Sequence, residues 1–137
     1  MFLLLSASPV IGGNDVSAKP EIGSKVLLVD DEMLVRAGTA IMLDELGHDV
    51  TEASSGKQAL EILAQHPHFD LIITDFRMPE MDGTVLISES RKIVPELKAV
   101  LMTGYEATDS RFAELKASSL NKPFSLADLE TAVCTAQ

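Results

Sequence analysis

Short apolar runs and longer amphipathic segments alternate along all but the first part of the chain. Three runs, at residues 26–29, 71–74 and 99–102, are almost continuously aliphatic. A run without polar alternation is typical of a strand that is buried on both faces, as in a parallel sheet. Two shorter segments, 48–53 and 118–121, complete a set of five expected strands.

The segments between these strands have the apolar spacing of helices. A first helix is expected from Glu32 to Leu46, because Gly47 would end it. Its apolar positions are Met33, Leu34, Ala37, Ala40, Ile41 and Leu43. Ser55 can cap a second helix that runs to Gln65. The apolar residues that this second helix would turn toward the core are Ala59, Leu60, Ile62 and Leu63.

Three more helices are expected in the second half of the chain. They lie at about residues 84–94, 107–117 and 126–136, and Ser125 can cap the last one. The segment 107–117 has few apolar anchors and is therefore a weak helix candidate. Five strands that alternate with five helices predict an α/β three-layer sandwich around a parallel sheet. Since crossovers are right-handed, the arrangement fits the flavodoxin-like strand order 2-1-3-4-5.

The chain of 137 residues has the length of one domain, which we place at residues 25–137. Residues 1–24 begin with an apolar stretch and continue with Ser, Pro, Gly and Asn. We interpret them as a terminal tail or as a linker from a preceding domain. No apolar run reaches the ~18–20 residues of a membrane span. A single cysteine, Cys134, excludes an internal disulfide and is expected to be a small buried residue on the last helix.

The charge balance narrows the possible partners. Eleven Lys and Arg residues against 21 Asp and Glu residues give a net charge of −10. A phosphate backbone is bound mainly through cationic side chains, so direct binding to nucleic acid is disfavoured. Aromatic residues make up only 4% of the chain, which also argues against stacking on single-stranded bases. A Mg²⁺ ion or a cationic partner is compatible with this balance.

Acidic residues follow two of the strands that should be neighbours in this sheet. Asp30 and Asp31 come after the first strand, and Asp75 comes after the third. Three carboxylates that meet at one sheet edge repel one another unless a cation lies between them. Oxygen ligands of this kind suit Mg²⁺. Thr103 and Lys122 follow the fourth and fifth strands and should reach the same edge.

This set of residues suits phosphoryl transfer. Asp75 is the expected nucleophile, because Asp30 and Asp31 can share the ion while the Asp75 carboxylate attacks phosphorus. Lys122 would pair with one phosphoryl oxygen, and the Thr103 hydroxyl would donate to another. Each residue alone also has an ordinary structural explanation. Asp30 and Asp31 could be the acidic first turn of a helix, and Asp75 could form an Asx turn. Thr103 could simply end a strand, and Lys122 could be a solvated lysine in a loop.

The motifs closely resemble the receiver domain of two-component response regulators. They are Val29-Asp30-Asp31-Glu32, Asp75-Phe76-Arg77-Met78-Pro79-Glu80-Met81-Asp82-Gly83, Thr103-Gly104 and Lys122-Pro123-Phe124. The resemblance covers residues 25–137 and implies the CheY-like form of the flavodoxin-like fold. It also implies a cytoplasmic signalling protein that catalyses its own phosphorylation and dephosphorylation, with no direct contact to nucleic acid or membrane.

In that family a phosphohistidine of a sensor histidine kinase or phosphotransfer domain donates its phosphoryl group to the aspartate that matches Asp75. The resemblance implies that Asp31 binds Mg²⁺ directly, that Asp30 binds it largely through water, and that the backbone carbonyl of Arg77 completes the protein ligands. Thr103 and Lys122 would contact the phosphoryl group. The bond before Pro123 is expected to be cis.

The sequence departs from the family pattern at one switch position. Most receivers have Tyr or Phe three residues before the lysine, where this chain has Ser119. The usual coupling of the threonine to an aromatic ring is therefore not expected here. We hypothesise that Arg77 and Tyr105 instead tune the lifetime of the acyl phosphate by controlling the access of water.

Two features bear on the parent protein and on rival functions. Since the chain ends at Gln137, no DNA-binding effector is expected to follow. The start of the chain, Ser119 and the Thr-Gly-Tyr stretch resemble receivers at the carboxyl end of hybrid sensor kinases, and this resemblance favours such an origin over a stand-alone regulator.

Three rival functions fit the residues less well. A Mg²⁺-dependent aspartyl phosphohydrolase would need an Asp-x-Asp motif on the first strand, which Asp30-Asp31-Glu32 does not provide. An FMN binder would need a phosphate-binding loop after that strand, where the acidic residues would repel phosphate. A phosphorylation-independent interaction domain would not need the acid set or Lys122, so their presence argues against it.

Overall fold

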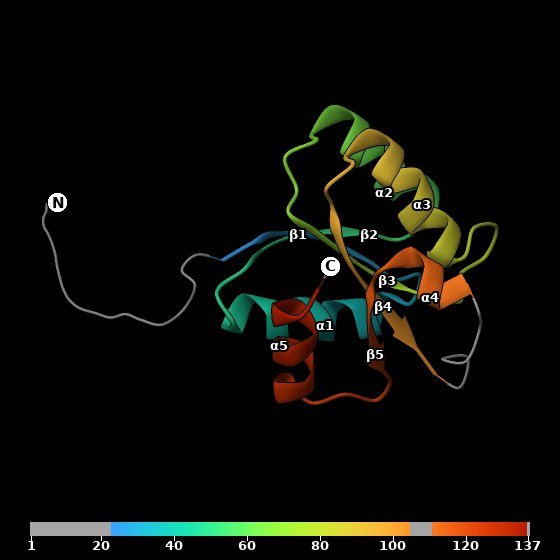
Figure 1. The fold of residues 1–137 in the computed structure, drawn as a ribbon. Helices are drawn as coiled ribbons and strands as arrows, with labels where there is room; N and C mark the ends of the chain where they lie inside the picture. The colour runs from blue at the N-terminus through green and yellow to red at the C-terminus, as the bar shows by residue number, and fades with distance from the viewer. Residues whose placement is uncertain (1–22, 105–110, 137) are drawn as a thin grey trace, which may run out of the picture.

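Five parallel strands form one sheet in the order β2-β1-β3-β4-β5 in the computed structural model of the protein, which describes residues 23–104 and 111–136 (Figure 1). The strands are β1 (Lys25–Val29), β2 (Asp49–Ala53), β3 (Leu71–Asp75), β4 (Lys98–Thr103) and β5 (Ser118–Asn121). This confirms the expected strand order. It places the carboxyl ends of β1, β3, β4 and β5 side by side, in that order.

Helices cover both faces of the sheet. They are α1 (Met33–Glu45), α2 (Gly56–Gln65), α3 (Gly83–Ile93), α4 (Arg111–Leu115) and α5 (Leu126–Cys134). Helices α1 and α5 lie on one face, and α2 and α3 lie on the other (Figure 1). The arrangement is the predicted three-layer sandwich.

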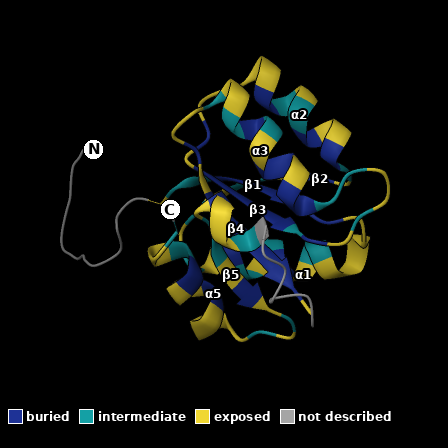
Figure 2. Ribbon diagram, turned by 45° about the vertical axis from the view of Figure 1, so that its right-hand side comes forward, coloured by how far each residue is buried: buried dark blue, intermediate teal, exposed yellow. Residues whose placement is uncertain are grey.

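The β1 strand shows why this sheet needs helices on both sides. Its residues 26–29 are all fully buried. Leu27 and Val29 pack into the core beneath α2 and α3, whereas Val26 and Leu28 pack into the core beneath α1 and α5. Figure 2 shows buried residues along the strands and exposed ones on the outer surfaces of the helices. A continuous apolar run therefore marks a doubly covered strand, as predicted.

Polar side chains fix the starts of three helices. The Ser55 side chain accepts a hydrogen bond from the Gln58 amide, as the sequence predicts. Ser125 and Asp128 form a capping box at the start of α5. Such side chains satisfy backbone amides that have no partner within the helix. Asp82 does the same for α3, which begins close behind β3.

Helix α1 exposes several of its apolar side chains to solvent. Met33, Leu34 and Ile41 are 66%, 83% and 64% exposed, although they belong to the apolar pattern of this helix. Its buried residues are Thr39 and Leu43. Because α1 is apolar on several sides, periodicity alone did not identify the side that faces the sheet.

The last third of the chain differs from the expectation at Cys134. Cys134 is exposed rather than buried, because it lies at the end of α5. Helix α4 lies within the segment expected at 107–117, and Arg91 on α3 donates hydrogen bonds to the carbonyl oxygens of Leu115 and Lys116 at its end. Residues 105–110, which include Tyr105, and most of the expected tail 1–24 lie outside the described residues.

Within residues 23–104 and 111–136, the helices are all too short or too polar to cross a bilayer.

Candidate acidic site at the carboxyl ends of the strands

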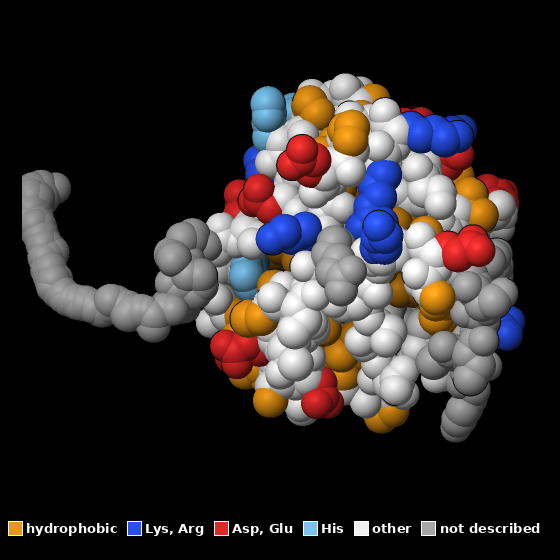
Figure 3. Space-filling view, in the orientation of Figure 1, with side chains coloured by type: hydrophobic (Ala, Val, Ile, Leu, Met, Phe, Trp, Pro, Cys, Tyr) orange, Lys and Arg blue, Asp and Glu red, His pale blue; other side chains and the backbone are white. Residues whose placement is uncertain are grey.

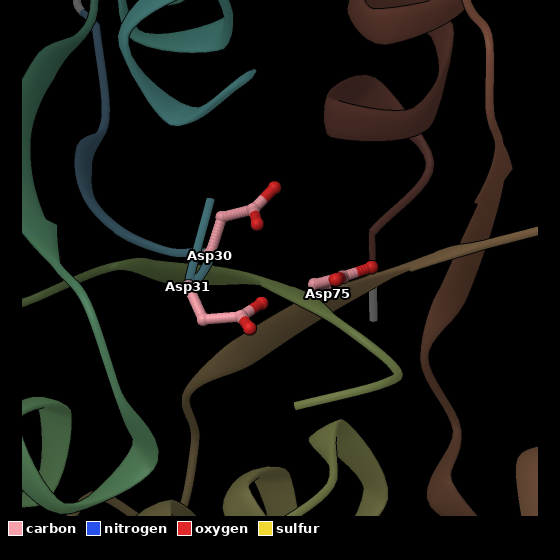
Figure 4. A group of neighbouring side chains, drawn as sticks. All are labelled: Asp30, Asp31 and Asp75. Atoms are coloured by element: carbon pink, nitrogen blue, oxygen red, sulfur yellow. The ribbon is translucent and has the colours of Figure 1, made fainter. Parts of the chain in front are cut away.

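Three aspartates meet where β1 and β3 end. Asp30 and Asp31 follow β1 directly, and Asp75 is the last residue of β3. The two strands pair in parallel with Val29 opposite Thr74, so their next residues lie at the same height. One carboxylate oxygen of each aspartate lies within 4.8 Å of the others (Figure 4). The structure thus brings together the acid set identified in the sequence.

The three carboxylates differ in their exposure to solvent. Asp30 is fully buried, the Asp75 side chain is 14% exposed, and Asp31 is exposed. A buried carboxylate needs hydrogen bonds or a counter-charge. Asp30 has both, because its Oδ1 accepts from the Glu32 amide at 3.0 Å and its Oδ2 lies 3.3 Å from the Lys122 Nζ.

Lys122 supplies the positive charge of the site. Its Nζ lies 3.2 Å from Oδ1 of Asp75 and thus bridges Asp75 and Asp30. The lysine is held in place by its own amide, which donates to the carbonyl oxygen of Thr103 at 2.7 Å. The following Lys122–Pro123 bond is cis, as predicted. With its backbone bonded to Thr103 and its Nζ beside Asp75, the Lys122 side chain reaches from the end of β5 to β3, two strands away in the sheet.

The pKa values of the site reflect this crowding. Burial raises the pKa of Asp75 above its usual range; the charge and hydrogen bond of Lys122 oppose the shift, and repulsion by Asp30 and Asp31 adds to it. Burial would lower the pKa of Lys122, but its attraction to Asp75 and Asp30 outweighs burial and raises that pKa. The lysine is therefore an ammonium ion at neutral pH, next to a carboxylate that is costly to ionise.

Thr103 reaches the same edge but is engaged elsewhere. It is the last residue of β4 and is 1% exposed. Its hydroxyl donates a hydrogen bond of 2.9 Å to Oδ1 of Asn121, the residue opposite it on β5. In this conformation the Thr103 hydroxyl therefore donates its hydrogen bond to a residue of β5. Ser119, on the same strand, is exposed.

The turn after β3 carries Arg77 and leads to α3. The side chain of Arg77 is exposed, and the role of its carbonyl oxygen as a metal ligand stays a prediction. The turn is closed by hydrogen bonds from Phe76 to the Met102 carbonyl and from Gly83 to the Phe76 carbonyl. A side chain at Gly83 would collide with the backbone oxygen of Asp75. The glycine thus lets α3 begin directly behind the central aspartate.

Two residues of this region were missed in the sequence. Arg36 on α1 donates from Nη1 to the carbonyl oxygen of Asp30 at 2.7 Å, and its Nε pairs with Oε1 of Glu52 at 2.9 Å. It therefore ties the peptide that joins Asp30 to Asp31 to strand β2. Asn121 was also missed. No local pattern identifies either residue, because both contacts depend on which strands are neighbours.

A groove lies between α1 and the loop after β5. Its volume is about 430 Å³. It is lined by Leu34, Val35, Gly38, Thr39, Met42, Lys122, Pro123 and Phe124. Since Lys122 lines both the groove and the acidic site, the exposed apolar face of α1 continues into that site.

Comparisons with known proteins agree with this geometry. The family model described as "Response regulator receiver domain" matches residues 26–134. The sensor kinase CckA of Brucella abortus is 43% identical over 113 residues, which are 79% of this chain and 12% of that protein. The response regulator receiver protein CpdR of the same organism is 38% identical over 109 residues, 77% of this chain and 89% of that protein.

A solved structure shows the same fold. The crystal structure of a response regulator receiver domain protein from Clostridium thermocellum has a TM-score of 0.75 and 30% sequence identity. The match covers 81% of this chain and 91% of that chain. The chain therefore spans nearly all of two relatives that consist of little more than this fold, but only about an eighth of the sensor kinase.

Proposed function

The chain belongs to the response regulator receiver domain family, and we propose that it accepts a phosphoryl group on Asp75 from a phosphohistidine. The observation that carries the proposal is the position of the Lys122 ammonium, which lies 3.2 Å from Asp75 and 3.3 Å from Asp30. An ammonium and three carboxylates at one sheet edge provide a nucleophile, a counter-charge for phosphoryl oxygens and ligands for a cation.

In the proposed transfer an oxygen of the Asp75 carboxylate attacks phosphorus. A P–O bond forms while the P–N bond to the donor imidazole breaks. The electron pair of the broken bond stays on the imidazole nitrogen, which then takes up a proton. The transfer adds negative charge beside Asp75, and the Lys122 ammonium, 3.2 Å from Oδ1 of Asp75, can offset part of it.

The acid set fits a hard divalent cation. Its donors are all oxygens, they lie within 4.8 Å of one another, and they include one buried and one exposed carboxylate. Mg²⁺ prefers such ligands and keeps several waters. We propose that Asp30, Asp31, Asp75 and the carbonyl of Arg77 hold it. When bound, the ion supplies charge that neutralises the incoming phosphoryl oxygens.

Lys122 and Thr103 would complete the phosphoryl site. Lys122 is already beside Asp75, so its ammonium can stay in contact with an oxygen of the transferred group. Thr103 ends the strand next to β3 and carries the hydroxyl donor. Each hydrogen bond to an anionic oxygen is stronger than a neutral one. The two residues would therefore stabilise the acyl phosphate.

The phosphodonor protein must bring its imidazole to Asp75, and we propose that it binds the groove along α1. Leu34 and Val35 line this groove, and Lys122 connects it to the acidic site. A partner seated there has an apolar contact surface and direct access to Asp75. On the face shown in Figure 3, acidic side chains lie among the basic ones, which does not suit a nucleic acid as the partner.

The proposed source of the chain is the receiver of a hybrid sensor kinase, which its likeness to the sensor kinase CckA supports. The sequence of the parent gene tests this origin. A kinase core encoded in the same reading frame supports it, and a gene that encodes this chain alone overturns it. A cytoplasmic location also stays a prediction.

Incubation with Mg²⁺ and acetyl phosphate, followed by intact-mass analysis, tests the proposed function. We expect the wild-type chain to gain the mass of one phosphoryl group. Asp75→Asn should gain none. Asp49→Asn is the matched control, since Asp49 is an exposed aspartate at the opposite end of the sheet. An unmodified wild type, or modification of Asp75→Asn, would overturn the proposal.

A further inference from the structure

A side-chain hydrogen bond joins the ends of β4 and β5 beside the acidic site. The Thr103 hydroxyl donates to Oδ1 of Asn121 at 2.9 Å, and the two residues lie opposite each other in the parallel register. The next residue, Lys122, donates its amide to the Thr103 carbonyl. Asn121, which accepts the hydrogen bond of Thr103, is therefore the sequence neighbour of Lys122, which forms an ion pair with Asp75.

The Thr103 hydroxyl can serve only one acceptor at a time. A hydroxyl group has a single proton to donate. In this structure the proton is given to Asn121. A phosphoryl group on Asp75 would add anionic oxygens at the end of β3, which pairs directly with β4. Two acceptors would then compete for the Thr103 hydroxyl proton: the neutral amide oxygen of Asn121 and a charged phosphoryl oxygen.

We propose that Asn121 is a positioning residue: it holds the Thr103 hydroxyl on β5 in the unphosphorylated protein and must release it before Thr103 can donate to a phosphoryl group on Asp75. The inference rests on the proposed function. The exchange is favourable because hydrogen bonds to charged acceptors are about twice as strong as neutral ones. The exchange would also link β5 to the site, because β5 loses a side-chain hydrogen bond when Asp75 is phosphorylated.

The position of Asn121 allows it to release the bond. It is exposed and lies on the edge strand of the sheet, so water can replace the lost hydroxyl at its amide oxygen (Figure 1). A buried amide would instead be left without a partner, at a cost that would oppose the exchange. Since Ser119 has no aromatic ring, Asn121 provides the side-chain contact between β5 and Thr103 that the structure does show.

The binding of beryllofluoride with Mg²⁺, a mimic of the phosphoryl group on Asp75, tests this inference in the full chain. Four proteins are compared by ¹⁹F NMR titration: wild type, Asn121→Val, Thr103→Val and the double variant. Valine removes the acceptor of Asn121 or the hydroxyl of Thr103, and its β-branched side chain suits a strand. A hydrogen bond of ordinary net strength corresponds to about a two- to tenfold change in affinity.

We expect Asn121→Val to bind beryllofluoride about two- to tenfold more tightly than wild type, because no bond must be given up. In the Thr103→Val background the same substitution should change nothing. An equal change in both backgrounds would show a merely structural role and overturn the inference, as would no change in either. Wild type that fails to bind beryllofluoride would instead refute the proposed function itself.

A second measurement needs no variant of Asn121. The side-chain amide signals of Asn121 should shift when beryllofluoride binds to wild type, and they should stay in place when it binds to Thr103→Val. Gln58 provides a reference signal, because its side-chain oxygen accepts from the Ser54 amide in the loop before α2, away from β5. Signals of Asn121 that do not move in wild type would also overturn the inference.

Discussion

The ammonium nitrogen of Lys122 lies 3.2 Å from Oδ1 of Asp75, the residue at the centre of the acidic site. The same nitrogen lies 3.3 Å from Oδ2 of the fully buried Asp30, which is 92 positions away in the chain. One cation thus offsets part of the repulsion among three carboxylates. This balance makes the stability of the site sensitive to each charge within it.

Removal of the Lys122 charge should destabilise the protein. Lys122→Met leaves the buried Asp30 with the Glu32 amide but without its counter-charge. Breaking a buried ion pair in this way typically costs roughly 3 kcal/mol. Urea unfolding at neutral pH should show a loss of this size, and added Mg²⁺ should restore part of it. An unchanged midpoint would contradict the electrostatic role of the lysine.

Neutralising Asp75 should have the opposite effect in the absence of Mg²⁺. Burial raises the pKa of Asp75 above its ordinary value of 3.8, so the folded protein keeps this proton to higher pH than the unfolded chain. Stability from this group is therefore lost as the pH rises through that window, and the ionised carboxylate is a cost at neutral pH. We expect Asp75→Asn to be more stable than wild type there.

The pH dependence separates this effect from other consequences of the substitution. The advantage of Asp75→Asn in urea unfolding should shrink as the pH is lowered through 3.8, below which the wild-type carboxyl is protonated in both states. A constant difference at every pH would mean that the stabilisation has another cause.

Mg²⁺ should stabilise the wild-type chain through the exposed Asp31. At a concentration a hundred times its dissociation constant, a ligand of the folded state adds about 2.7 kcal/mol. Asp31→Ala should lose most of this gain, while its stability without Mg²⁺ should hardly fall, because the side chain is exposed. Thermal unfolding with and without Mg²⁺ measures both quantities. Equal stabilisation of both proteins would place the ion elsewhere.

Arg36 should influence Mg²⁺ affinity without contacting the ion. Its guanidinium fixes the carbonyl of the peptide that leads into Asp31. We expect Arg36→Met to weaken Mg²⁺ binding by about tenfold, as found for groups that orient metal ligands. Calorimetric titration measures this. Lys92→Met, which removes an exposed ion pair with Glu89 on α3, should leave the affinity unchanged.

The sequence predicted those parts of the site that follow from a general rule about parallel sheets. Asp30, Asp31 and Asp75 could be brought together in advance, because strand ends of neighbouring parallel strands share one edge. The contacts of Arg36 and Asn121 could not, because they need the register of particular strands. A parallel register is set by packing over the whole sheet rather than by residues near these two.

Helix α1 shows a second limit of sequence patterns. Its apolar residues predict a helix correctly, yet Leu34 is 83% exposed while Thr39 is buried. Periodicity identifies a single apolar stripe, and a helix with apolar residues on two sides gives no unique answer. The exposed apolar side of α1, which includes Leu34, is where we propose that the phosphodonor protein binds. Cys134 was misplaced for a simpler reason, since helix ends are hard to locate.

The position of the phosphoryl group in the chain shows whether Asp75 is the phosphoacceptor. Borohydride reduces an aspartyl phosphate to homoserine, and peptide mass analysis then identifies the modified residue. After phosphorylation with Mg²⁺ and acetyl phosphate, we expect homoserine at position 75 alone. Modification at Asp30 or Asp31, or a phosphorylated chain without homoserine at position 75, would contradict it.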